Sequence, residues 1–198
     1  LTSAIDSGYI EASISDSNVK INPSQNSAIA NINIVLGIEH KFGKIIFKNK
    51  YIDYDQIKKY APFKTGDTYS ETKTNELKKN LVESKLFKSI EITPKQNNNN
   101  INIILDTTLK PKNEYQIGVG FDSDEYIRAT FDITNNYISN NGDSSKLSLK
   151  ASSSELEAGL QYYSPGYDPI TTTEILSLYL DTKDNQEIGI SNYAEVSA

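Results

Sequence analysis

Residues 114–169 read EYQIGVGFDSDEYIRATFDITNNYISNNGDSSKLSLKASSSELEAGLQYYSPGYDP, and apolar and polar residues alternate in them through four short runs. The first run places Tyr115, Ile117, Val119 and Phe121 on one face and Gln116, Gly118 and Gly120 on the other. The same alternation continues over residues 127–133, 147–151 and 156–162. Because a period of two points successive side chains to opposite faces, the stretch predicts four consecutive β strands.

The polar face of these strands bears on the choice between a membrane barrel and a soluble sandwich. The charged residues of this face are Arg128, Asp132, Lys150, Glu155 and Glu157. A dry core between two sheets rejects such charges, whereas a water-filled barrel lumen accepts them. Tyrosines gather near the ends of the runs, at positions 115, 126, 137, 162 and 163. They fit an aromatic girdle at lipid headgroups, and they also fit ordinary strand propensity. The pattern favours the beginning of a barrel, with a soluble β-rich binding module as the alternative.

The composition of the 198 residues excludes several classes of function. There is no Cys and a single His, His40, so disulfides are impossible, and zinc sites and Ser–His–acid chemistry lack their residues. The net charge of −6 argues against a nucleic-acid partner, which attracts basic patches. We therefore expect no enzyme activity and no catalytic, cofactor-binding or metal residues. His40 is expected at the surface, at the end of a strand.

Hydropathy leaves a membrane location open. The sequence contains no apolar run of about 18 residues, which a transmembrane helix requires. The mean hydropathy of −0.51 is still compatible with a barrel, because half of each barrel strand faces water. The chain begins at Leu1 and lacks Met, and we expect it to be an excerpt of a longer protein. Two carboxylate pairs, Asp122 with Asp124 and Glu155 with Glu157, are expected to be structural rather than calcium or glycosidase sites.

The segment 41–110 predicts the order strand, helix, helix, strand, strand. A β-branched run over residues 43–49 is followed by Asp53 and Gln56, which have the spacing of a capping box for a short helix. A second capping signature over residues 68–71 opens a longer helix. Its buried face is expected to contain Leu77, Leu81 and Val82.

The segment closes with two expected strands, residues 86–93 and 101–107, joined by Pro94 and the tract Asn97–Asn100. Residues 1–40 resemble the second half of the same unit, with a helix end over residues 1–7, a strand over 8–14 and a long strand over 28–38. The chain therefore contains about one and a half copies of a module of roughly 70 residues.

These segments resemble POTRA modules of the outer-membrane assembly factors of the BamA and TamA kind, in which such modules precede a β-barrel. The residues that carry the resemblance are FGKIIFKN (42–49), PFKTGD (62–67), LKKNLVESKLFKSIEI (77–92) and INIILD (101–106). Asn49 replaces the usual strand-end glycine of the family, and Lys85 stands where the family often has glycine. The first barrel strands and the turn YYSPGYDP (162–169) are similar to those of TamA.

The resemblance implies an α+β fold of POTRA modules (β-α-α-β-β), followed by antiparallel strands of a truncated transmembrane β-barrel. The expected boundaries are residues 1–40 for the C-terminal half of one module, 41–110 for a complete module, and 111–198 for the first five to six barrel strands. With the modules in the periplasm, the turns over residues 122–125, 152–154 and 181–186 would face outward. The turns over 139–143 and 164–173 would then lie in the periplasm.

The resemblance also implies a mechanical function in the outer membrane of a Gram-negative bacterium. In this family the first and last barrel strands pair weakly, so that the seam opens and templates a client strand. The seam strand would comprise Tyr115, Ile117, Gly118, Val119, Gly120 and Phe121. A POTRA edge strand, with Phe87, Ser89, Ile90, Glu91 and Ile92, would pair with an extended partner. The expected partners are unfolded outer-membrane client proteins, outer-membrane lipid and, for a TamA, the inner-membrane-anchored TamB.

Other members of the superfamily remain open as alternatives. The chain could belong to a BamA-type general barrel assembly factor or, more distantly, to a TpsB-type secretion pore. A patatin-type autotransporter lipase would also carry a POTRA module and a barrel, but the lipase motif G-x-S-x-G does not occur in these 198 residues. The glycines Gly118 and Gly120 would weaken a seam strand, or would make room for the contents of the lumen.

Overall fold

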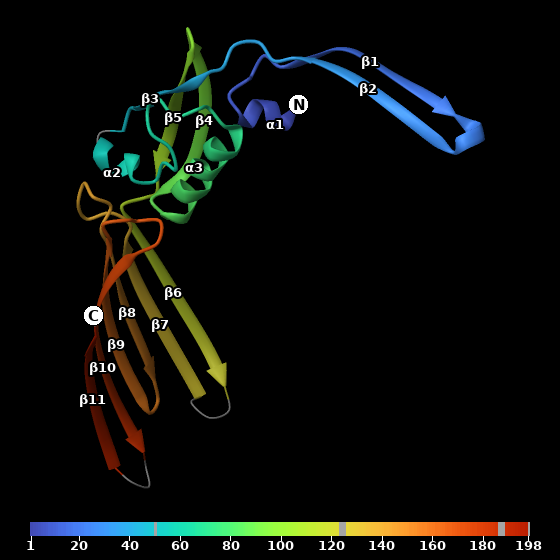
Figure 1. The fold of residues 1–198 in the computed structure, drawn as a ribbon. Coiled ribbons are helices and arrows are strands. Elements are labelled where there is room, and N and C mark those ends of the chain that lie inside the picture. The colour runs from blue at the N-terminus through green and yellow to red at the C-terminus, as the bar shows by residue number, and fades with distance from the viewer. Residues whose placement is uncertain (50, 123–125, 186–188, 198) are drawn as a thin grey trace. The chain divides into compact units, whose positions relative to one another are not determined.

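The computed structural model describes residues 1–49, 51–122, 126–185 and 189–197. The chain divides into two compact units. The first unit contains residues 1–48, 61–80 and 91–106, and the second contains residues 49–60, 81–90 and 107–198. The elements of both are labelled in Figure 1.

The N-terminal part of the first unit is a short helix followed by a hairpin. Helix α1 spans Thr2–Asp6, and the antiparallel strands β1 (Ser13–Asn22) and β2 (Ser27–Val35) are joined by the turn η1 (Pro23–Gln25). The strand expected over residues 8–14 is wrong in position. Gly8 has a φ of +89°, and Ala12 donates its N–H to the carbonyl of Tyr9, so this stretch turns and β1 begins only at Ser13.

A three-stranded sheet follows, in the order β3-β5-β4. Its elements are β3 (Lys41–Phe47), α2 (Tyr54–Lys58), α3 (Glu71–Glu83), β4 (Phe87–Asn97) and β5 (Asn100–Leu109). Strand β3 pairs with β5 in parallel, which a connection through two helices permits. The predicted order strand, helix, helix, strand, strand is confirmed.

Two details of the β4–β5 hairpin differ from expectation. Pro94 lies within β4 instead of joining the strands, and the edge position of β4 explains why a residue without an N–H is tolerated there. The turn itself is made at Asn98, whose φ of 53° is left-handed, a conformation that asparagine adopts more readily than most residues.

Aromatic packing forms the centre of the core in the first unit. The ring of Phe42 stacks on that of Phe63 at 3.7 Å between centroids and lies 5.1 Å from that of Tyr69. The aliphatic residues buried in this unit are Leu77, Ile101, Ile103 and Leu105, and those buried in the second unit include Ile52, Ile57, Leu81 and Leu86. The expectation for Val82 is wrong. It is 58% exposed, because the buried stripe of α3 runs from Leu77 to Leu81, four residues apart, and Val82 lies about 100° further round.

His40 is buried, with 1% of its surface exposed, so the expectation of a surface histidine is wrong. Its backbone N–H donates to the carbonyl of Gly8 at 2.8 Å, and its backbone carbonyl accepts the N–H of Tyr69 at 3.0 Å. Its Nε2 lies 3.0 Å from Nε2 of Gln96. Partners distant in sequence therefore enclose this side chain, and the residues next to it in the sequence do not reveal them.

The two helices are capped in different ways. Asp53 occupies the N-cap position of α2, but its side chain makes no capping hydrogen bond, so the expected capping box with Gln56 is absent. The cap of α3 is Ser70, whose Oγ accepts the N–H of Lys73 at 3.2 Å. Asp6 adds a second cap from outside the helix, because its Oδ1 accepts the N–H of Thr72 at 2.9 Å.

The second unit contains a six-stranded sheet in the order β11-β10-β9-β8-β7-β6, with every neighbouring pair antiparallel. Its strands are β6 (Asn113–Asp122), β7 (Tyr126–Asn135), β8 (Ser144–Ser152), β9 (Glu155–Pro165), β10 (Thr173–Asn185) and β11 (Gly189–Ser197). The predicted run of antiparallel strands is confirmed, and the sheet is open.

The turns of this sheet agree with expectation where they are described. Residues 153–154 join β8 to β9, and the longer loops 136–143 and 166–172 join β7 to β8 and β9 to β10. The expected turns over 122–125 and 181–186 extend outside the described residues, and residues 181–185 belong to β10 rather than to a turn. In the described part of the chain, the helices are too short or too polar to cross a membrane.

Candidate membrane and strand-pairing surfaces

One face of the six-stranded sheet is apolar across its strands. The register aligns Tyr115, Ile133, Leu147, Leu160, Leu178 and Val196 in one row, and Ile117, Phe131, Leu149, Ala158, Leu180 and Ala194 in the next. Many side chains of this face are exposed, including Ile117 at 76% and, in the following row, Val119 at 81%. From Tyr115 to Phe121 the apolar residues run about 20 Å along the strand. An exposed apolar surface of this extent is typical of a face that contacts lipid or another protein.

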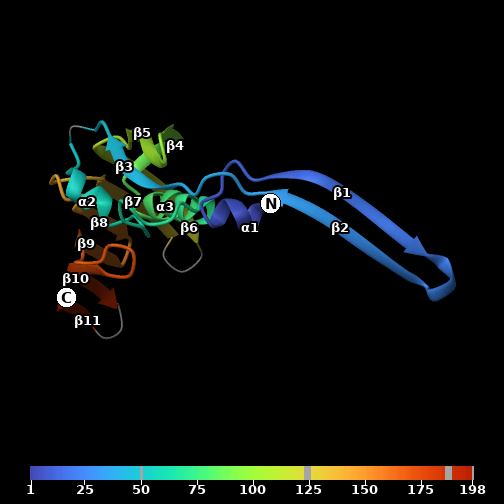
Figure 2. The same cartoon turned by 45° about the horizontal axis from the view of Figure 1, so that its top comes forward.

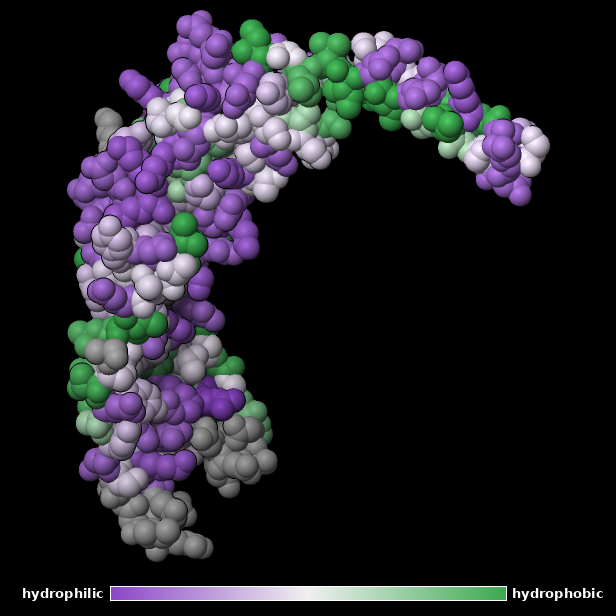
Figure 3. Space-filling model, viewed as in Figure 1, coloured by the Kyte–Doolittle hydropathy of each residue, from purple (hydrophilic) through white to green (hydrophobic). Residues whose placement is uncertain are grey.

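The opposite face of the same sheet is polar in corresponding rows. One row contains Gln116, Asp132, Ser148, Gly159, Tyr179 and Glu195, and the next contains Gly118, Thr130, Lys150, Glu157, Asp181 and Tyr193. Figure 3 shows hydrophilic side chains over much of the sheet face turned toward the viewer. The alternation seen in the sequence therefore separates an apolar face from a polar one.

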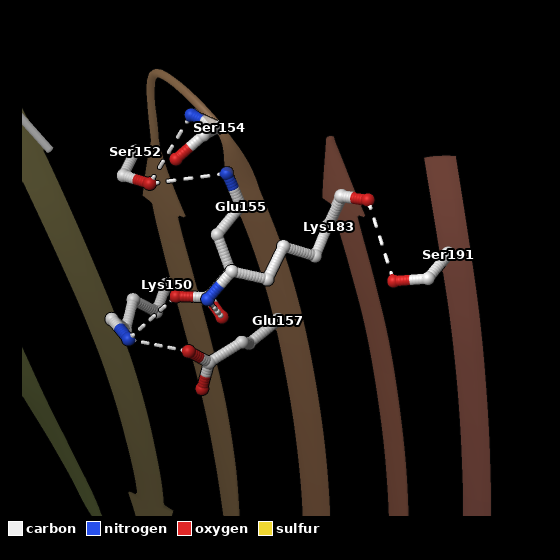
Figure 4. Close-up of polar contacts among 7 residues, drawn as sticks. All are labelled: Lys150, Ser152, Ser154, Glu155, Glu157, Lys183 and Ser191. Atoms are coloured by element: carbon white, nitrogen blue, oxygen red, sulfur yellow. Dashed lines mark hydrogen bonds and ion pairs between the residues drawn. The ribbon is translucent and has the colours of Figure 1, made fainter. Parts of the chain in front are cut away.

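Ion pairs connect neighbouring strands on the polar face. Nζ of Lys150 lies 3.2 Å from the carboxylate of Glu155 and also bonds Glu157. Nζ of Lys183 lies 3.5 Å from the second oxygen of Glu155 (Figure 4). The pair Glu155 and Glu157 is thus neutralised by lysines, as expected for a structural pair, whereas Asp124 and the side chain of Asp122 lie outside the described residues. Among the described residues, no cluster of three or more His, Cys, Asp or Glu could hold a metal ion.

Two hollows occur within the second unit. A shallow cavity of about 240 Å³ lies on the polar face beside Lys150, Glu157 and Tyr179. A cleft of about 420 Å³ lies between residues 83–86, at and just after the end of α3, and the loop ends of the strands, at Glu114 and Lys146. Both are lined by polar as well as apolar groups and both open to solvent, so neither resembles a closed ligand pocket.

The expected seam strand lies at an edge of the sheet. Strand β6 pairs with β7 on one side, and among the described residues no strand pairs with its other side. Gly118 lies opposite Thr130, and a Cβ added at this position would clash with the Thr130 hydroxyl oxygen. Gly120 is less crowded, because a Cβ added there would lie 3.8 Å from the nearest Arg128 nitrogens. Gly118 therefore makes room for a side chain of the polar face, whereas Gly120 does not.

The expected partner-binding strand β4 also lies at an edge, beside β5. Its five candidate residues differ in exposure: Phe87 is buried, Ile90 and Ile92 are half-buried, and Ser89 and Glu91 are exposed. Phe87 therefore belongs to the core, and its side chain is not available to a partner. The backbone edge of β4 is the part that could pair with an extended strand, which stays a prediction.

A family model for POTRA, described as a surface antigen variable number repeat, matches residues 40–111. These are the residues that form the strand, helix, helix, strand, strand unit described above. Residues 40–111 form a POTRA module. A comparison with curated proteins found no match to the chain.

Solved structures resemble a larger part of the chain. The crystal structure of BamA from Haemophilus ducreyi lacking POTRA domains 1–3 aligns with 92% of the chain at 18% identity and a TM-score of 0.74. CdiB from Acinetobacter baumannii aligns with 98% of it, at 18% identity and a TM-score of 0.58. The chain spans 35% of the first structure and 39% of the second. These likenesses concern the fold, in which a POTRA module precedes antiparallel strands.

The structure explains the motif positions of the POTRA module. A Cβ on Gly43 would overlap Oδ1 of Asn102, which accepts the N–H of Lys44, so any larger residue there must displace the Asn102 side chain. Lys85 has a φ of 60°, just after the end of α3, where glycine is favoured. Asn49 accepts the N–H groups of Tyr51 and Ile52 through Oδ1. The family motifs marked these positions and include Asn102, but nothing in the sequence indicated its contact with Gly43, and Asp6 carried no sequence signal.

Proposed function

We propose that this chain is part of an outer-membrane protein assembly and translocation factor, a TamA-like insertase. The proposed location is the outer membrane of a Gram-negative bacterium, with the POTRA module in the periplasm. One observation supports this most: a POTRA module is followed directly by antiparallel strands with an exposed apolar face and an ion-paired polar face. The apolar face would contact lipid and the polar face would line a barrel lumen.

The proposed action is mechanical and involves no enzyme chemistry. The free backbone groups along β6 would pair with the first strand of an unfolded outer-membrane client. Such pairing lowers the cost of moving a client strand into lipid, where unsatisfied N–H and C=O groups are expensive. The edge of β4 would hold extended segments in the periplasm, either clients in transit or TamB.

The assignment to a TamA, rather than to a BamA-type factor or the carrier of a patatin-type lipase, depends on the parent protein. Sequencing the open reading frame on both sides of this chain tests it. Three POTRA modules and an Arg-Gly-Phe loop support the TamA assignment. Five modules would favour a BamA-type factor, and an upstream G-x-S-x-G domain would make the chain the carrier of an enzyme.

Site-specific disulfide crosslinking tests the templating step. The chain contains no Cys, so a single Cys at Val119 in β6 can be paired with single Cys residues along a stalled client strand. A Cys at Leu149 in β8 is the matched control, because β8 is already paired on both sides. We expect client crosslinks from position 119 and none from position 149. Equal crosslinking at both positions, or client insertion without any crosslink at β6, would contradict the proposal.

A further inference from the structure

A group of tyrosines lies at the loop end of the sheet in the second unit, on a backbone segment that is hydrogen-bonded at two points. Asn49 Oδ1 accepts the N–H of Tyr51 at 2.8 Å, and Ile52 is buried with 3% of its surface exposed. The N–H of Asp53 then donates to the carbonyl of Asn140 at 3.0 Å. With this segment anchored on both sides, Tyr51 is 64% exposed and Tyr54 40% exposed.

The loop 136–143, which joins β7 to β8, supplies the other side of this group. Asp143 orders the loop, because its carboxylate accepts the hydroxyls of Ser139 at 2.5 Å and Ser164 at 2.8 Å. The ring of Tyr137 lies 6.2 Å from that of Tyr51. Helix α2 and this loop lie side by side in both ribbon views (Figure 1, Figure 2).

The position of this group relates it to the apolar face of the sheet. Alternate turns of an antiparallel sheet lie at the same end, so the loops 136–143 and 166–172 share one end. The last row on this side of the sheet before that end contains Tyr162 and Leu176, beside Ser145 and Asn135. The second loop adds Tyr167, which is 95% exposed, and Ile170, which is 43% exposed. Exposed aromatic and apolar residues therefore continue from the apolar face into the loop between β9 and β10.

We propose that Tyr51, Tyr54 and Tyr137 form a tyrosine patch that contacts the headgroup layer of a phospholipid membrane. This proposal rests on the proposed function, which places the apolar face of the sheet in lipid. A tyrosine ring is apolar and its hydroxyl is polar, which suits the boundary between acyl chains and water. Nζ of Lys58 lies 4.3 Å from the centre of the Tyr54 ring and 3.0 Å from Oδ1 of Asp55, so its charge at this surface is paired with a carboxylate. Two of the three tyrosines belong to the POTRA module, which would thus touch the membrane directly.

Quenching by brominated lipids tests the patch. The chain contains no Trp, so single Trp residues can be introduced into the parent protein, with any other Trp replaced by Phe, and reconstituted in phosphatidylcholine vesicles. The probe is Tyr54→Trp. The matched control is Lys59→Trp, at the C-cap of the same helix, where the helical backbone places it about 140° away from Tyr54. Val119→Trp reports on the apolar face of the sheet.

The three Trp variants together distinguish failure of the patch proposal from failure of the proposed function. We expect strong quenching of Val119→Trp by bromines deep in the acyl chains. We also expect quenching of Tyr54→Trp by bromines near the headgroups, at least twofold stronger than that of Lys59→Trp. If Val119→Trp is quenched and Tyr54→Trp is quenched no more than Lys59→Trp, the patch proposal fails while the proposed function stands. If Val119→Trp is not quenched in the reconstituted protein, the proposed function fails and the patch fails with it.

Discussion

The Asp6 carboxylate and Thr72 are joined by two hydrogen bonds across 66 positions of sequence. Oδ1 of Asp6 accepts the N–H of Thr72 at 2.9 Å, and Oδ2 accepts the Thr72 hydroxyl at 2.8 Å. Ser70 donates its hydroxyl to the same carboxylate at 3.1 Å. A negative charge at the N-terminus of α3 is favourable because the first N–H groups of a helix have no partners within it. Asp6 therefore ties the N-terminal segment to the POTRA module.

Replacing Asp6 by Asn should destabilise the first unit in a pH-dependent way. The hydrogen bonds from the backbone and side chain of Thr72 lower the pKa of Asp6 below its ordinary value of 3.8. A carboxyl group with a lowered pKa contributes its stability above the ordinary pKa and loses it as the pH falls through the lowered value. The difference in Tm between wild type and Asp6→Asn should thus be full at pH 7 and shrink at acidic pH. Asp16→Asn, on the exposed strand β1, is the control. An equal difference at every pH would contradict the role of the charge.

Replacing Lys85 by Gly should stabilise the protein. The left-handed φ of 60° costs a residue with a Cβ about 1–2 kcal/mol, whereas the greater freedom of glycine in the unfolded chain costs about 0.5–1 kcal/mol. We expect a net gain of about 0.5–1 kcal/mol in the free energy of unfolding, measured by urea titration. Lys88→Gly, in the extended strand β4, serves as control and should lower stability. A loss of stability in Lys85→Gly would show that the lysine side chain contributes more than its backbone strain costs.

Replacing Gly43 by Ala should displace the side chain of Asn102. The added Cβ would overlap Oδ1 of Asn102, which accepts the N–H of Lys44 at 2.9 Å. Loss of that hydrogen bond should cost about 1–2 kcal/mol. A double-mutant cycle with Asn102→Ala measures the coupling between residues 43 and 102. We expect Gly43→Ala to lower the free energy of unfolding much less in the Asn102→Ala background than in the wild type. Additive effects of the two substitutions would refute this explanation of the glycine.

Replacing Gly118 and Gly120 by Val together should slow client insertion several-fold while the barrel still folds. Both changes stiffen β6 and favour its extended state, which opposes the opening of a seam. The single variants separate stiffening of β6 from crowding on the polar face. A Cβ at position 118 would clash with the hydroxyl of Thr130, whereas position 120 has room. If slowing occurs only in Gly118→Val and is relieved by Thr130→Ala, crowding on the polar face explains it. Insertion at the wild-type rate in the double variant would reject the role of the glycines in the seam.

Replacing Ile90 by Pro should reduce crosslinking of an extended partner to β4, because proline removes a backbone donor from the edge. The circular dichroism spectrum must remain that of the wild type for the result to count. Ser139→Pro, in the loop 136–143, controls for a general effect of proline. Unaltered crosslinking of a partner along β4 in a folded Ile90→Pro protein would refute pairing at this edge.

The expectations that the structure confirmed rest on short-range periodicity. Tyr115, Ile117 and Val119 share a face because a strand alternates, and neither long-range contacts nor a closed barrel are needed to infer it. The helix of residues 71–83 is likewise expected from the spacing of Leu77 and Leu81 and from the capping signature over residues 68–71, although the side chain that caps it is that of Ser70 rather than Thr68. Val82 shows the limit of this reasoning, because an apolar residue next to a buried stripe need not lie on it.

The sequence by itself determined the order of the strands and helices and the two faces of the six-stranded sheet, because both depend on residues within a few positions of one another. Only the tertiary structure decided that His40 is buried against Gln96, that Asp6 caps a helix 66 residues away, and that Asn102 fills the space beside Gly43. Each of these contacts joins residues that are far apart in the chain. Their partners are chosen by packing, which the local pattern of the sequence does not describe.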